Sequence, residues 1–120
     1  MAKYVDGFVI PLPKKKLRFY KNVARKAGKI WMEFGALEYR ECIGDDLNIK
    51  GMTSFPRISR AKKGETVVFS WIVYKSKADR NRINAKIMKD PRILGMMDPK
   101  DMPFDVKKMA MGGFKVLVEY

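Results

Sequence analysis

Histidine is absent from this sequence of 120 residues, and cysteine occurs once, at Cys42. A hydrolase triad that relies on a histidine base, and a metal or haem that relies on a histidine ligand, are therefore excluded. The phosphate-loop motif and the dinucleotide-binding glycine motif are missing as well. A lone cysteine cannot form an internal disulfide, so we interpret Cys42 as a small buried residue on a strand, in a reducing cytoplasm. These absences predict a protein without a resident cofactor.

Carboxylates offer the one remaining route to a metal site. Asp98, Asp101 and Asp105 lie close together in the sequence, and Asp45 is followed directly by Asp46. A hard cation such as Mg²⁺ can be held by carboxylates alone. Aspartates in loops more commonly cap turns, so we favour that interpretation and predict no metal.

Long hydrophobic runs are also absent. No stretch approaches the roughly 20 apolar residues that a membrane span needs. Residues 1–7 lack the order of basic, apolar and small residues that marks a signal peptide. With 47% hydrophobic residues, the chain fits one domain over residues 1–120 with one core. We expect a cytoplasmic protein with no membrane partner.

Acidic residues are scarce relative to basic ones, 13 against 26, which gives a net charge of +13. Residues 1–60 carry 13 basic and 6 acidic side chains, and residues 61–120 carry 13 and 7. The positive charge therefore belongs to the folded body and not to a basic tail. Such a body favours acidic partners, and nucleic acid in particular.

The order of hydrophobic patterns predicts an α+β protein. The strand-like stretches are residues 4–12, 36–43, 65–74 and 114–118, and the helix-like stretches are residues 14–34 and 76–89. The first and third strands are apolar on both faces, as central strands are, whereas the second carries Glu38, Arg40 and Glu41 and belongs near an edge. This β-α-β-β-α-β order is that of the ferredoxin-like sandwich.

Ser76 is the expected cap of the second helix, with Asp79 at the capping-box position. The connections over residues 44–64 and 92–108 are too long for simple turns, and irregular segments of that length are usually functional or mobile. Within the first of them, we expect residues 55–59 to form a short extra strand or arm.

The predicted first helix carries a continuous basic face, and no acidic residue precedes Glu33 in it. Like charges three or four residues apart destabilise a helix by roughly 0.2–0.5 kcal/mol per pair, so a bound anion would offset a real cost. Two interpretations stay open: binding of nucleic acid or another polyanion, and a generally basic composition. The residues of this basic face are Lys14, Arg18, Lys21, Arg25 and Lys29.

The RNA-recognition motif shares this order of elements, but its aromatic pattern is missing. Its third strand needs a basic residue and glycine followed by alternating aromatic residues. Here Lys63 and Gly64 are followed by Glu65, Thr66 and Val67. That module is excluded, although a basic helix can bind phosphates without it.

Asp6 is the one acidic residue inside an apolar strand. A buried carboxyl group can carry a proton, or it can pair with a lysine or arginine at the end of the sheet, and we favour the pair. Trp71, together with Phe69 and Tyr74, either lines a pocket or belongs to the core.

Several short motifs run through nearly the whole chain in a specific order. They are YVDGFV at 4–9, FGAL at 34–37, EC at 41–42, GDD at 44–46, VFSWI at 68–72, DPR at 90–92, MPFD at 102–105 and GGF at 112–114. In these motifs the sequence resembles the YbaA-like bacterial family, domain of unknown function 1428. The resemblance implies a dimeric α/β barrel, the architecture of small cofactor-free monooxygenases and related stress proteins. The resemblance implies no catalytic residue. The predicted first helix, which has basic side chains and no acidic residue before Glu33, departs from the family.

A homodimer is also expected on physical grounds. A four-stranded ferredoxin-like sheet covers one face with its helices, and the other face would expose the apolar side chains of both central strands to water. Packing two such faces together with two-fold symmetry buries both of them.

Two functional hypotheses follow. The first is a homodimer whose cavity binds a small molecule or performs cofactor-free chemistry. The second is binding of nucleic acid or another polyanion by the basic face of the first helix. The residues expected around the cavity are Asp6, Trp71, Met102, Phe104 and Asp105.

Overall fold

The structure is a computed structural model that describes residues 2–120. Its four strands, β1 (Tyr4–Pro13), β2 (Glu38–Ile43), β3 (Glu65–Tyr74) and β4 (Ala110–Lys115), form one antiparallel sheet in the order β2-β3-β1-β4. The helices are α1 (Leu17–Glu33), α2 (Phe55–Ser59), α3 (Lys77–Ile87) and α4 (Pro91–Met96), with 3-10 turns η1 (Lys14–Lys16), η2 (Pro99–Asp101) and η3 (Val106–Lys108). The order of elements and the sheet confirm the ferredoxin-like α+β fold.

The central strands are β1 and β3, as their two-sided apolar patterns predicted. They pair along their whole lengths, from Tyr4 opposite Tyr74 to Pro13 opposite Glu65. Residues directly opposite each other in an antiparallel pair share a face, and alternate residues along a strand point to opposite faces. The register therefore divides the side chains of the sheet into two sets.

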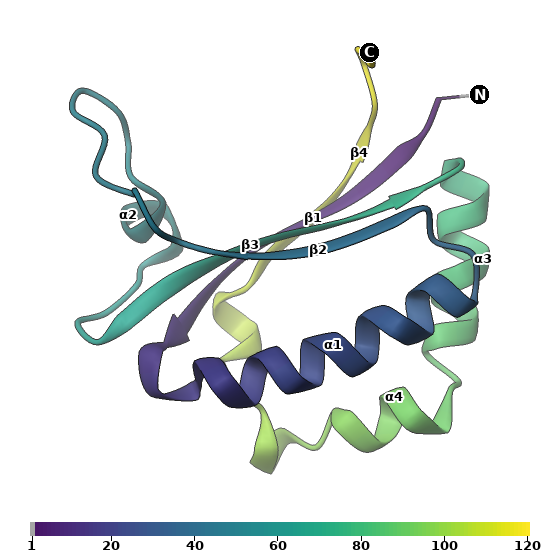
Figure 1. Cartoon of the computed structure of the whole chain (residues 1–120), viewed down its shortest axis with the longest axis horizontal. Helices are drawn as coiled ribbons and strands as arrows, with labels where there is room; N and C mark the ends of the chain where they lie inside the picture. The colour runs from purple at the N-terminus through teal and green to yellow at the C-terminus, as the bar shows by residue number, and fades with distance from the viewer. Residues whose placement is uncertain (1) are drawn as a thin grey trace.

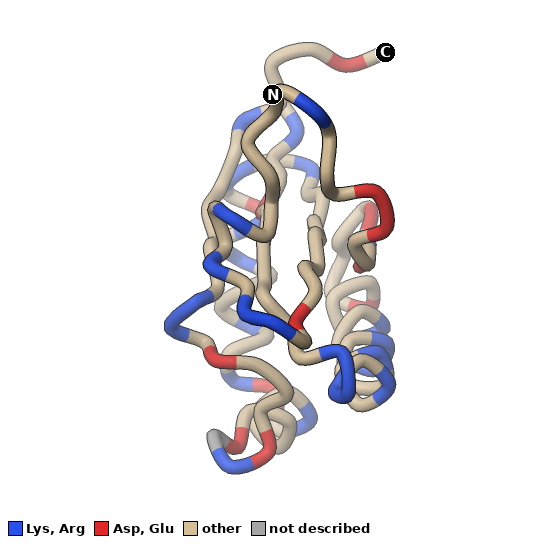
Figure 2. Tube along the Cα trace, turned by 90° about the vertical axis from the view of Figure 1, so that its left-hand side faces the viewer, with Lys and Arg blue, Asp and Glu red and all other residues tan. Residues whose placement is uncertain are grey.

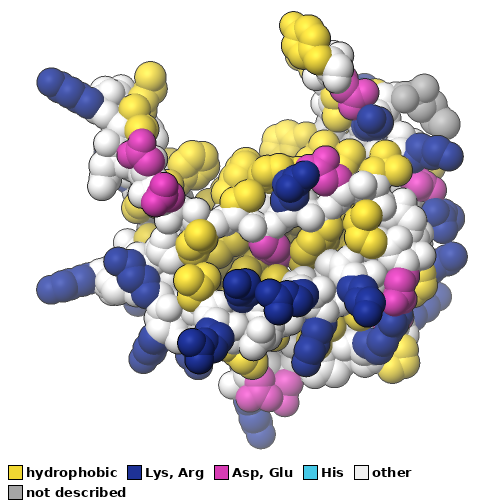
Figure 3. All heavy atoms as spheres, viewed as in Figure 1, with side chains coloured by type: hydrophobic (Ala, Val, Ile, Leu, Met, Phe, Trp, Pro, Cys, Tyr) yellow, Lys and Arg dark blue, Asp and Glu magenta, His cyan; other side chains and the backbone are white. Residues whose placement is uncertain are grey.

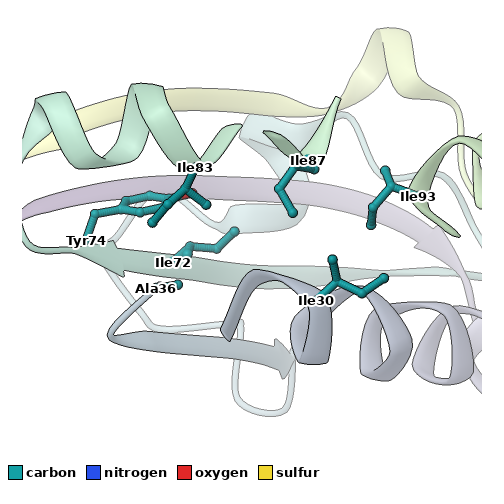
Figure 4. Packing of buried hydrophobic residues seen from close by; sticks show 7 residues of the cluster. All are labelled: Ile30, Ala36, Ile72, Tyr74, Ile83, Ile87 and Ile93. Atoms are coloured by element: carbon teal, nitrogen blue, oxygen red, sulfur yellow. The ribbon is translucent and has the colours of Figure 1, made fainter. Parts of the chain in front are cut away.

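Helices α1, α3 and α4 lie on one side of the sheet, while α2 lies on the other (Figure 1). The main core lies between the sheet and the helices (Figure 4), and its buried members are Ile30, Ala36, Ile72, Tyr74, Ile83, Ile87 and Ile93. We call the face away from α1, α3 and α4 the open face. Among its side chains are those of Val5, Val9, Phe69, Trp71 and Phe114.

Local sequence signals explain where several elements begin. The side-chain oxygen of Ser76 accepts a hydrogen bond of 3.1 Å from the backbone N–H of Asp79, which confirms the predicted cap of α3. The helix predicted from residue 14 starts as the turn η1, and α1 begins at Leu17. Tyr20 and Ala24 are buried on the face of α1 that packs on the sheet.

Three predicted segments are wrong in detail. Residues 55–59 form the helix α2, since Ser54 caps it and Pro56 occupies its first turn, so the strand alternative of that prediction is wrong. The last strand spans Ala110–Lys115 instead of residues 114–118. The connection over residues 92–108 holds most of α4 and two 3-10 turns, which the side chains of Asp98 and Asp105 cap.

Basic positions are spread along the whole trace, as the even division of charge along the sequence implies (Figure 2). Within residues 2–120, the helices are all too short or too polar to cross a membrane.

Candidate functional site

A cavity of about 500 Å³ lies between the sheet and the helices. Its size falls in the range of roughly 300–1,000 Å³ that is usual for small-molecule sites. Its walls are mainly apolar, and six of the nine methionines of the chain contribute to them. Unbranched thioether side chains adapt to irregular apolar ligands. These residues are Met88, Met96, Met97, Met102, Met109 and Met111.

One end of the cavity holds a buried polar network centred on Asp6, a residue that is 1% exposed. Its carboxylate accepts hydrogen bonds from Arg80 Nε at 3.0 Å and from Asn84 Nδ2 at 3.3 Å. Asn84 Oδ1 in turn accepts from the hydroxyl of Tyr74 at 3.3 Å and from the indole N–H of Trp31 at 3.2 Å. Strand β1, helix α3, strand β3 and helix α1 each supply part of this Asp6 network, so it connects both layers of the fold.

The pKa of the Tyr74 hydroxyl is raised well above its ordinary value, first by burial and then by the nearby carboxylate of Asp6. Tyr74 is therefore protonated at neutral pH and acts as a hydrogen-bond donor. Arg80 also lies over the ring of Tyr4, with its guanidinium carbon 4.9 Å from the ring centroid. The predicted ion pair of Asp6 is confirmed, and Arg80 is its partner.

A second polar group, the Glu41 cluster, lies where α1 faces the edge strand β2. One carboxylate oxygen of Glu41 accepts a hydrogen bond of 2.6 Å from the hydroxyl of Tyr20, and the other accepts one of 2.7 Å from Tyr39. Burial, followed by the charge of Glu41, raises the pKa of both tyrosines above the ordinary range. Both phenols therefore stay protonated and hold the carboxylate between helix and strand.

Ser70 lies on β3 between these two polar groups. Ser70 is 4% exposed and lines the cavity. In the sheet it lies directly opposite Phe8 of β1 and Glu41 of β2. Among residues 2–120, the Ser70 hydroxyl has no hydrogen-bond partner, and its oxygen is not completely buried. The hydroxyl is thus available to a molecule in the cavity.

The residues expected around the cavity are only partly brought together. Asp6, Met102 and Phe104 line it, and the ring of Phe104 packs edge-on against Tyr20 with centroids 5.8 Å apart. Asp105 is not part of the lining, because its carboxylate caps η3 by accepting from Lys107 N.

Trp71 borders the cavity, but its indole ring lies on the open face. The ring packs against Phe69 with centroids 5.6 Å apart, and its N–H donates to Glu38 at 3.1 Å. Hydrogen bonds from Arg40 and then from Trp71 hold the pKa of the Glu38 carboxyl below its ordinary range. The half-buried Cys42 lies opposite Phe69 in the same sheet register, so its thiol is also on the open face.

A groove of about 630 Å³ runs between α1 and β2. Lys21, Arg25 and Lys29, three of the five residues of the predicted basic face, line it, whereas Lys14 and Arg18 do not. In the space-filling view, a row of Lys and Arg side chains borders a hollow lined by hydrophobic side chains (Figure 3). Within the described residues, no cation from Lys14 to Lys29 has an acidic partner within salt-bridge distance.

The described residues contain no group of three histidine, cysteine, aspartate or glutamate side chains placed to hold a metal ion. Several polar residues of the cavity and of the Asp6 network were missed by the sequence patterns. They are Arg80, Asn84, Ser70, Glu41, Tyr20 and Tyr39. Only Ser70 could have been noticed in the sequence, because it interrupts an apolar strand. The positions of the other residues depend on packing between elements that are distant in the sequence.

The sheet order and the helix-covered cavity define a ferredoxin-like α+β protein. A solved "dimeric ferredoxin-like protein" from an uncultured marine organism matches this fold with a TM-score of 0.63, at 14% identity and over 100% of both chains. A nipsnap family protein with unknown function from Agrobacterium tumefaciens matches with a TM-score of 0.58, at 16% identity, over 96% of this chain and 88% of that one. At these identities the likeness shows the fold alone.

The chain belongs to the family described as "Protein of unknown function (DUF1428)", which residues 3–106 match. It is 43% identical over 117 residues to "Uncharacterized protein YbaA" of Escherichia coli strain K12, which covers 98% of each chain. The protein of the same name from Shigella flexneri matches to the same extent. The family resemblance of the sequence motifs is thus confirmed.

Proposed function

We propose that the protein is a cytoplasmic homodimer of one-domain subunits, each of which binds a small, mainly apolar molecule in the cavity between its sheet and its helices. The cavity itself supports the proposal most directly, because about 500 Å³ of space with methionine-rich walls also contains convergent polar groups. A densely packed core leaves few voids larger than a water molecule, so a space of about 500 Å³ is unusual there and is large enough to hold a small ligand.

The polar groups supply orientation and chemistry. The hydroxyl of Ser70 is free to bind a polar atom of the ligand, and the Asp6 network and the Glu41 cluster present fixed donors and acceptors. A cofactor-free reaction in this cavity would draw on the carboxylates and protonated phenols of these two groups.

The open face supports the homodimer. Phe69 is 45% exposed and Phe114 is 61% exposed on it, and Val5, Val9 and Trp71 are only half-buried. The segment that carries α2 and the segment after β4 project on the side away from the helices (Figure 1), and Figure 3 shows hydrophobic side chains between them. A second copy packed face to face would cover these side chains. A protein of the same fold is described as dimeric, which supports this arrangement.

Native mass spectrometry of the purified protein tests both parts together, because it reports the mass of the dimer and of any retained ligand. Ala27→Leu fills part of the cavity from α1 and is expected to abolish retention of the ligand without unfolding the protein. Ala85→Leu makes the same change at an exposed position of α3 and is the matched control. Equal ligand retention in the two variants, with circular dichroism showing both folded, would exclude the cavity as the binding site.

A second candidate function is binding of nucleic acid or another polyanion by the basic face of α1. The observation that favours it is the lack of acidic partners for the cations from Lys14 to Lys29 among the described residues. Fluorescence anisotropy with labelled RNA and duplex DNA over a salt series tests it. If about five phosphates are contacted, the logarithm of the affinity for duplex DNA falls against the logarithm of salt with a slope near −4 to −5. An absence of binding at low salt excludes this function.

A further inference from the structure

We infer that the ligand is an anionic single-chain amphiphile, whose chain lies in the cavity and whose head group binds Lys21, Arg25 and Lys29 at the rim of the groove. The inference rests on the proposed small-molecule function and names the class of molecule. It follows from three features of the groove: the wall that it shares with the cavity, its cations, which lack acidic partners among the described residues, and its exposed apolar side chains.

The groove and the cavity are adjacent and share part of their walls. Tyr20, Ala24, Tyr39 and Glu41 line both of them, so the Glu41 cluster stands at the boundary between the two spaces. A molecule longer than the cavity would reach the groove by passing between these side chains. Its inner part would contact methionine and aromatic side chains, and its outer end would reach α1.

The outer end would meet positive charge. Lys21, Arg25 and Lys29 are exposed and lie four residues apart along one side of α1. Glu41 is the one acidic side chain among the described residues that line the groove, and both of its oxygens accept hydrogen bonds from tyrosine hydroxyls. Among the described residues, none of the three cations lies within salt-bridge distance of an acidic side chain, so an anionic head group would relieve the repulsion among them.

The same groove also exposes apolar side chains between helix and strand. Leu17, Met32 and Ile43 belong to its lining and are all exposed. A phosphate backbone offers nothing apolar to cover them, whereas the chain of an amphiphile does. Charge and apolar surface side by side are the complement of an amphiphile, and this favours it over a purely polar polyanion.

Calorimetric titration of the full chain with dodecanoate, dodecanol and a labelled RNA tests the inference. Dodecanoate is expected to bind at least about tenfold more tightly than dodecanol, which has the same chain and no charge. Dodecanoate carrying bromine near the end of its chain should quench the fluorescence of Trp31, which lines the cavity, and Trp31→Phe should remove that quenching. Quenching that Trp31→Phe leaves unchanged would place the chain outside the cavity and overturn the inference.

Matched variants locate the head group. Lys21→Glu/Arg25→Glu removes two groove cations and is expected to weaken dodecanoate binding at least about tenfold while leaving dodecanol unaffected. Arg18→Glu/Lys26→Glu makes the same charge change on the same helix outside the groove and should change dodecanoate binding by less than about twofold. Equal loss in both variants, or equal affinity for dodecanoate and dodecanol, would overturn the assignment of the head-group site.

Two further binding measurements, with lipid vesicles and with RNA, distinguish an amphiphile site from a membrane-binding or nucleic-acid-binding surface. Cosedimentation with anionic phosphatidylglycerol vesicles in the absence of dodecanoate binding would assign the cations to a membrane surface, and RNA binding alone would assign them to nucleic acid. Either outcome overturns the inference. A neutral ligand found in the cavity by native mass spectrometry would also overturn it, but would leave the proposed small-molecule function intact.

Discussion

The two faces of the sheet use the same strands in opposite ways. Toward the helices, β1 and β3 bury polar side chains, Asp6 and Ser70, among apolar ones. Toward the other side, the same strands leave Phe69 exposed and Val9 and Trp71 half-buried. A monomer is expected to bury its large apolar groups and expose its polar ones, so each face departs from that pattern in its own direction. We interpret the helix-covered face as a ligand site and the open face as a protein interface.

Removing the cation that neutralises Asp6 should have the largest effect on the covered face. Arg80→Ala leaves a carboxylate that is 1% exposed without its ion-pair partner, and the free energy of unfolding should fall by about 3–5 kcal/mol. Arg82→Ala breaks an exposed pair with Asp79 on the same helix and should cost no more than about 1 kcal/mol. Urea unfolding measures both. Similar losses of unfolding free energy in the two variants would show that the buried Asp6–Arg80 pair matters no more for stability than an exposed ion pair.

On the open face, Phe69→Asp should split the dimer. A symmetric interface between two open faces would contain this residue twice. Because a buried aromatic anchor contributes at least about 2 kcal/mol, the dissociation constant should rise roughly a thousandfold. Phe19→Asp is the matched control, because Phe19 is 42% exposed on α1 and Phe69 is 45% exposed. In the monomeric variant, the thiol of Cys42 should also react faster with an alkylating reagent. Dissociation by both substitutions would argue against the open face as the interface.

High pH should weaken the covered face specifically. The pKa values of Tyr20, Tyr39 and Tyr74 are raised by burial and then by carboxylates, while tyrosines of the unfolded chain ionise near pH 10. The stability that these protonated phenols give the folded protein is therefore fully present below pH 10. Above pH 10, the free energy of unfolding falls by about 1.4 kcal/mol per pH unit for each tyrosine. Ultraviolet difference spectroscopy should show these three phenols ionising together with unfolding. Ionisation of all five tyrosines in the folded protein would contradict this account.

The smallest effect is expected from Ser70→Ala. The hydroxyl has no partner among the described residues, so its loss should change stability by less than about 0.5 kcal/mol. Affinity for the retained ligand should fall about fivefold, which corresponds to one neutral hydrogen bond. Calorimetry and urea unfolding of one preparation give both values. A loss of stability without a loss of affinity would make Ser70 a packing residue only.

The central strands could be predicted because two-sided apolar patterns occur where a strand is covered on both faces. The bounds of β3, Glu65–Tyr74, are those predicted from the sequence. The last strand was misplaced because Gly112 and Gly113 weaken a strand by propensity, whereas pairing with β1 overrides that preference. A side chain at Gly113 would collide with Arg80 and Tyr4, so the glycine makes room for the ion pair of Asp6.

The candidate site was harder to predict than the fold. A basic partner for Asp6 was expected, but the sequence could not select Arg80, which lies 74 residues away, from among 26 lysines and arginines. The contacts of Glu41 depend on how α1 packs against β2, and no local pattern encodes that packing. For Trp71 a signal was present, since alternation along a strand places it on the same face as Phe69 and opposite to Ser70.

Sedimentation equilibrium of the unmodified protein, at micromolar concentration and physiological salt, tests the central claim most directly. The interpretation of the two faces requires a second copy to cover Phe69, Trp71 and Phe114, and screening over about 8 Å weakens the repulsion between subunits of charge +13. We predict a mass of two 13.9 kDa chains. A folded species with the mass of one chain would contradict the claim that the open face is an interface.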